Sequence, residues 1–217
     1  MEQLVLDCHE APNDPRCKGS HGTVFTATYA FPKPPTSALQ FLIGGGYSHG
    51  FLNGGTLPSG GLDIGVSYIQ GLTGPLPGPE GGGYHGFVAE AITQVYGGGA
   101  IFTSGNKTLG SGALLLRPQL HLGYEFESFG GFGTDDMSQH SVGVFVAYAL
   151  GAQYTLLSGD VSTSSTDFAH GPIVGVELGR YQPMQRNWVR GFVRTQLLFV
   201  GSSNTPFLGV GGGAAFP

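Results

Sequence analysis

Residues 114–128, LLLRPQLHLGYEFES, alternate between two kinds of side chain along their whole length. One set is apolar and contains Leu114, Leu116, Pro118, Leu120, Leu122, Tyr124 and Phe126, and the other is mostly polar or charged. Successive side chains of a β-strand point to opposite faces, so this period of two predicts a strand between two different surroundings. Ordinary strands contain about 5–6 residues, whereas a tilted strand that crosses a bilayer needs about 9–11. The stretch is therefore typical of a membrane-spanning strand.

The composition supports this interpretation, because the chain is short of charge. Charged residues make up 11% of the 217 residues, against roughly 25% in an ordinary soluble domain. A soluble β-sandwich would need many more charges to cover its outward face. No apolar run reaches about 18 residues, so the sequence predicts no transmembrane helix. The net charge of −5 leaves no basic surface for nucleic acid.

Eight further stretches show strand-like alternation or apolar runs between turn signals. They are residues 23–31, 37–47, 62–71, 83–102, 140–157, 171–181, 187–201 and 206–216. The segments between them are dense in Gly, Pro, Asn, Asp and Ser, which favours turns between antiparallel strands. Bacterial single-chain barrels usually have an even number of strands. We therefore expect eight strands, with ten as the next choice, and an error among the nine candidates at 23–31 or 83–102.

The pattern resembles the small bacterial outer-membrane barrels of the OmpA, OmpX and OmpW type over about residues 21–217. Phe216 stands near the terminal aromatic position of that class, but Pro217 follows it, which departs from the pattern. The resemblance implies an all-β fold, an antiparallel up-and-down transmembrane β-barrel. It also implies the outer membrane of a Gram-negative bacterium as the location and the lipid bilayer as the main partner, with other envelope proteins as further candidates.

Residues 1–20 are expected to form a separate N-terminal loop before the barrel at 21–217. They contain no basic region followed by an apolar core, so we expect an export signal to have been removed. Cys8 and Cys17 are the only two cysteines, and a disulfide between them would suit an oxidising periplasm or cell surface. Zinc binding with His9 is the alternative, although this trio supplies only three ligands.

Charged residues interrupt the polar faces of the predicted strands: Asp63, Glu90, Arg117, Glu125, Glu127, Glu177, Arg190 and Arg194. If the apolar faces meet lipid, these side chains point into the lumen, where buried charges must be paired. We expect the three arginines to pair with the five carboxylates. The excess carboxylates should accept hydrogen bonds from Gln119, Gln153, Gln196 or tyrosines, or lie near the hydrated rims of the barrel. The alternative is a lumen that passes a small solute.

Catalytic, metal and cofactor sites are not predicted. The seven histidines are scattered and form no metal-binding spacing, and no nucleophile has an evident base beside it. Six aromatic residues near strand ends could form membrane-interface girdles, or some of them could be ordinary strand residues: Tyr47, Tyr84, Tyr96, Tyr124, Tyr181 and Trp188.

The function predicted from these features is structural or interactive: an envelope anchor, an adhesion surface or a subunit of a larger assembly. A narrow channel for small or apolar solutes is the alternative, and a soluble lipocalin-like or sandwich binding protein is the third reading. Orientation separates the last reading from the first two. The membrane readings require outward exposure of Leu116, Leu120, Leu122, Val144, Val146, Val176 and Val193.

Overall fold

The computed structural model describes residues 2–6, 25–29, 37–72, 82–132, 139–182 and 187–217. The chain divides into two compact units, Met1–Lys33 and Pro34–Pro217. In the first unit, β1 (Glu2–Leu6) pairs antiparallel with β2 (Phe25–Tyr29). Cys8 and Cys17, the residues of the predicted disulfide, lie outside the described residues.

The second unit is a closed barrel of eight antiparallel strands, which confirms the predicted fold class and strand number. The strands are β3 (Ser37–Leu52), β4 (Gly55–Gly71), β5 (Gly82–Ser104), β6 (Lys107–Phe132), β7 (Gln139–Gly159), β8 (Thr163–Gln182), β9 (Asn187–Val200) and β10 (Thr205–Phe216). Each strand pairs with the next one along the chain, and β10 pairs with β3 to close the ring. No helix long and apolar enough to span a membrane occurs in the part of the chain that the structure describes.

The error among the nine strand candidates lies at the first one. Residues 23–31 contribute β2, which pairs with β1 and not with any barrel strand. The other suspected stretch, 83–102, is a single strand within β5. The strands of the barrel therefore begin at Ser37.

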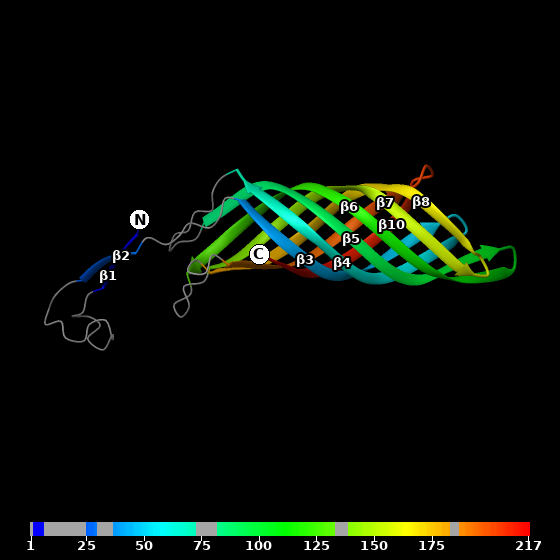
Figure 1. Ribbon diagram of the computed structural model, residues 1–217, viewed down its shortest axis with the longest axis horizontal. Helices are drawn as coiled ribbons and strands as arrows, with labels where there is room; N and C mark the ends of the chain where they lie inside the picture. Colours follow the sequence, from blue (N-terminus) through cyan, green and yellow to red (C-terminus); the bar gives the residue numbers. More distant parts are fainter. Residues whose placement is uncertain (1, 7–24, 30–36, 73–81, 133–138, 183–186) are drawn as a thin grey trace. The chain divides into compact units, whose positions relative to one another are not determined.

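The barrel strands are staggered, and Figure 1 shows them winding obliquely around the barrel. Following paired residues once around the ring from Ala38 leads back to β3 at Ser48, ten residues further along (48 − 38 = 10). Strand number and stagger together set the width of a barrel, and eight strands leave an interior that side chains can fill. The stagger also brings together side chains that are far apart in the sequence.

The barrel has two different mouths. The turn mouth carries the short connections 53–54, 105–106, 160–162 and 201–204, all of which are described. The chain-end mouth carries both ends of the barrel chain, Ser37 and Phe216, and the remaining connections. Several predicted turn segments proved too long, because strands β4, β6 and β8 begin within them, at Gly55, Lys107 and Thr163. A left-handed glycine, such as Gly54 at φ 76°, reverses the chain in only two residues.

Candidate functional site

Every strand of the barrel contributes exposed apolar side chains to the outer wall. All seven residues chosen as the orientation test are exposed, with Val176 at 54% and Leu120 at 44%. The charged residues of the same strands are buried inside; Arg117 and Glu90, for example, are 0% exposed. The predicted orientation is therefore confirmed, and a two-sheet core with its apolar side chains inside is excluded.

Aromatic side chains border this apolar wall toward both mouths. Toward the chain-end mouth, Phe41 pairs with Phe216 across the closing seam, and Phe87 packs edge-on against Tyr124 with ring centroids 5.8 Å apart. Toward the turn mouth, the exposed aromatics are Tyr47, Phe51, Tyr154 and Phe168. The wall between these two groups is mainly aliphatic, with residues such as Ile64, Leu122, Val146, Val174 and Val193.

Several of the residues predicted as girdle aromatics point the other way. Tyr47 and Tyr124 are exposed, but Tyr96, Tyr181 and Trp188 are buried in the lumen. Strand parity explains the error, because Tyr96 shares its face with Glu90 and Trp188 shares its face with Arg190. The side chain of Tyr84 lies outside the described residues.

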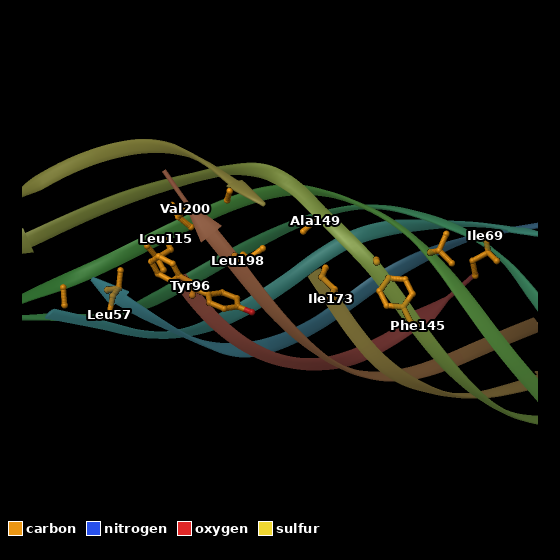
Figure 2. Close-up of a cluster of buried hydrophobic side chains, with 14 of the residues drawn as sticks. Leu57, Ile69, Tyr96, Leu115, Phe145, Ala149, Ile173, Leu198 and Val200 are labelled. Atoms are coloured by element: carbon orange, nitrogen blue, oxygen red, sulfur yellow. The ribbon is translucent and has the colours of Figure 1, made fainter. Parts of the chain in front are cut away.

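The lumen is filled with side chains over most of its length. A cluster of buried apolar residues runs along it, and Figure 2 shows Tyr96, Phe145, Ile173 and Leu198 projecting into the space that the strands enclose. Polar side chains occupy the layers between these residues. The interior therefore resembles a packed core, as expected for an eight-stranded barrel.

Arg194 on β9 lies at the centre of the charge network. Its Nη1 and Nη2 donate to the two oxygens of Glu90, at 2.5 and 2.9 Å, and Nη2 also donates to Glu177 at 2.7 Å. Glycine makes room for it, because a Cβ at Gly175 would lie 2.6 Å from the Arg194 Cγ. The guanidinium also lies over the ring of Phe145, 4.2 Å from its centroid, which adds a cation–π contact.

Arg190 lies two inward positions from Arg194 along β9 toward the chain-end mouth, beyond Phe192, and is 1% exposed. Its Nη1 donates to Glu125 at 2.8 Å and also to Glu177, and its Nε donates to Gln40 at 2.9 Å. Glu177 therefore bridges Arg190 and Arg194. The network joins strands β3, β5, β6, β8 and β9 across the lumen, so it ties the walls of the barrel to each other.

Arg117 differs from the prediction. Its Nε donates to Gln153 at 2.6 Å and its Nη1 to Ser48 at 3.0 Å, and no ion pair of Arg117 occurs among the described residues. The guanidinium lies over the rings of Phe207 and Tyr96, 4.7 and 5.8 Å from their centroids. Neutral acceptors and aromatic faces thus surround this cation, where we had expected a carboxylate.

Two of the predicted carboxylates lie apart from the arginine pairs. Glu127, near the chain-end mouth, is buried and accepts a hydrogen bond from Ser141. Asp63 faces a small internal cavity of about 40 Å³ together with Tyr96 and His121. The buried Glu127 Oε2 and Asp63 Oδ1 atoms have no hydrogen-bond partner among the described residues. These oxygens are where the acidic excess predicted from the sequence is located.

Histidine and glutamine side chains fill the middle of the lumen. His121 contacts Glu90 at 3.2 Å and Gln119 at 2.9 Å. Gln94 Oε1 accepts from Gln119 at 3.4 Å and from Gln196 at 3.3 Å. The predicted role of Gln119, Gln153 and Gln196 thus shifts, because their hydrogen bonds go to Gln94, His121, Arg117 and Thr155 and not to carboxylates. His121 was not selected as a site residue from the sequence, but it shares its inward face with Arg117 and Glu125.

No metal-binding group of three or more His, Cys, Asp or Glu side chains occurs among the residues that the structure describes. Comparisons of the chain with protein-family models, curated proteins and solved structures found no match. The function must therefore be argued from the barrel itself.

Proposed function

We propose that this chain is an integral membrane β-barrel of a bacterial outer membrane, of the same general kind as the small OmpA, OmpX and OmpW barrels. The observation that carries the proposal is the apolar outer wall, bordered by aromatic side chains, around a polar and charged interior. Contact between such an apolar wall and water would be unfavourable, whereas lipid chains would cover the wall. A closed ring of strands also satisfies its backbone hydrogen bonds internally, as the bilayer core requires.

We further propose a structural or interaction role in the envelope, as an anchor, an adhesion surface or a subunit of an assembly. The packed lumen supports this role over a channel. Arg190, Arg194 and their three glutamates cross the interior, and Phe145 and Trp188 lie among them. An ion entering the lumen would have to displace these pairs, which costs several kcal/mol for each buried charge left unpaired.

Membrane insertion can be tested with spin labels on a chain in which Cys8 and Cys17 are replaced by serine. A label at Val146, in the middle of the apolar wall, should collide readily with dissolved oxygen and rarely with a water-soluble nickel chelate. A matched label at Thr108, on the exposed polar part of β6 near the turn mouth, should show the reverse. Equal exposure of both labels to the nickel chelate would contradict the membrane proposal and favour a soluble barrel.

A further inference from the structure

The turn mouth opens into a vestibule inside the barrel. The vestibule has a volume of about 380 Å³, which falls within the range of small-molecule pockets, roughly 300–1,000 Å³. All four connections around this mouth are described. The lining of the vestibule is therefore fully described, and no loop longer than these four connections covers it at this end.

One side of the vestibule wall is apolar and the other side is mixed. Leu52, Leu57 and Phe102 from β3, β4 and β5 form the apolar side. The other side carries the hydroxyl groups of Thr155 and Ser165, from β7 and β8, beside further apolar side chains. A molecule that fits this space would accordingly need one apolar side and one polar end.

Asp167 supplies the only charge among the described residues that line the vestibule. It is half-buried on the inward face of β8, and no hydrogen bond or ion pair of its carboxylate occurs among the described residues. Gly201 at φ 72° brings bare backbone beside it, because a Cβ there would lie 3.2 Å from Asp167 Oδ1. The carboxylate thus faces the vestibule without a partner.

The floor of the vestibule separates Asp167 from the nearest buried cation. Gln153 pairs with Asp167 across the β7–β8 ladder, and its amide is already bound to Arg117 and Thr155. Phe207 also lines the vestibule and covers the guanidinium of Arg117. Arg117 is 0% exposed, so a ligand in the vestibule meets the carboxylate and does not meet the arginine.

We infer that this vestibule binds a small amphipathic amine, with its ammonium group at Asp167 and its apolar body against Leu57 and Phe102. The charge of the lining selects a cation over an anion, and the apolar wall selects a hydrophobic body over a hydrated metal ion. A hydrogen bond between an ammonium and a carboxylate is about twice as strong as one between neutral groups. The inference goes beyond the proposed envelope role, and it requires the folded barrel but not a particular partner protein.

The test is ligand-detected NMR with the full chain in lipid nanodiscs, using three probes of similar shape: phenethylammonium, 2-phenylethanol and 3-phenylpropionate. Phenethylammonium should bind more tightly than the alcohol, and the carboxylate should not compete with it. Asp167→Asn should weaken amine binding about tenfold, the typical effect of losing one charge-assisted hydrogen bond, and leave the alcohol unaffected.

Two variants serve as controls. Asp160→Asn removes the same charge at the same mouth but outside the vestibule lining, so amine binding should be retained. Ser202→Trp, at the exposed rim, should fill the vestibule and abolish binding of both probes. Equal binding of amine and alcohol, tighter binding of the carboxylate, or an equal loss in both aspartate variants would each overturn the inference. The spin-label experiment measures membrane insertion separately. Failure of the amine-binding inference would therefore not imply failure of the membrane proposal, or the reverse.

Discussion

At the scale of single residues, the three arginines of the lumen bind two different kinds of partner. Arg190 and Arg194 hold glutamates, whereas Arg117 holds Gln153, Ser48 and two aromatic rings. The sequence predicts that all three point inward, because each lies opposite the apolar set of its strand. It does not predict their partners. These depend on how far each strand is shifted along its neighbours, a shift that adds up to ten residues around the ring.

We expect Arg194→Ala to lower the free energy of unfolding by about 3–5 kcal/mol, because it leaves Glu90 and Glu177 buried without their cation. Urea unfolding in lipid vesicles can be followed by the fluorescence of Trp188, the only tryptophan of the chain, which lies in the lumen. Arg180→Ala removes an exposed arginine near the chain-end mouth and should cost less than about 1 kcal/mol. Equal losses in the two variants would contradict a structural role for the network.

Arg117→Lys should destabilise the barrel by about 1–2 kcal/mol although the charge is kept. A lysine ammonium cannot donate in one plane to Gln153 and Ser48 while stacking on Phe207. The same urea unfolding experiment measures this loss. Unchanged stability would show that only the charge at this position matters.

At the scale of strands, alternation was a sufficient guide to orientation but a weaker guide to strand ends. The period of two placed Leu116, Val144 and Val176 outside without reference to any other strand. Segments rich in glycine and proline were predicted as turns, yet β4 starts at Gly55 and passes through Pro58 and Gly60. Such residues are read as turn signals because they are rare in strands, but two-residue connections leave the rest of each segment to the ladder.

We expect Leu120→Arg to cost roughly 2–4 kcal/mol of folding free energy in lipid, the range measured for arginine on the lipid face of a barrel near the bilayer midplane. Leu120 is exposed on β6 between the two groups of aromatic residues. Thr108→Arg places the same side chain on the same strand near the turn mouth and should cost less than about 1 kcal/mol. A similar cost at both positions, measured by vesicle refolding, would place the bilayer elsewhere on the barrel.

At the scale of the whole molecule, the packed interior predicts that the barrel is closed to ions. Purified protein added to a planar bilayer should produce no stepwise conductance at neutral pH. Arg194→Ala should not open a channel either, because Phe145, Phe192 and Arg190 still fill the same layers. Regular conductance steps in the unaltered protein would favour the channel reading, and a change in ion selectivity on replacing Arg194 would place that residue in the ion path.

The architecture as a whole was largely predictable, because the period of two and the shortage of charge indicated a barrel around a polar interior. The number eight came from the even strand count of bacterial barrels, since the pattern alone gave nine candidates. The vestibule was not predictable. Asp167 belongs to a stretch that had been predicted as a turn, and it faces Leu57 only because β4 and β8 lie on opposite sides of the ring. Such a site can be recognised only in the three-dimensional structure, because it forms when the barrel closes.

The closing seam has a consequence for how the molecule forms. Every other pairing in the barrel joins consecutive strands, but β10 and β3 bring together residues as distant as Phe216 and Phe41. Forming this one contact between distant parts of the chain restricts far more chain freedom than forming a hairpin. The seam also pairs Gly211, Gly212 and Gly213 with a second run of glycines, which offers few side-chain contacts to an approaching strand. Ring closure should therefore be the slow, late step of assembly. It should be preceded by an open sheet of hairpins with β3 and β10 as its two unpaired edges.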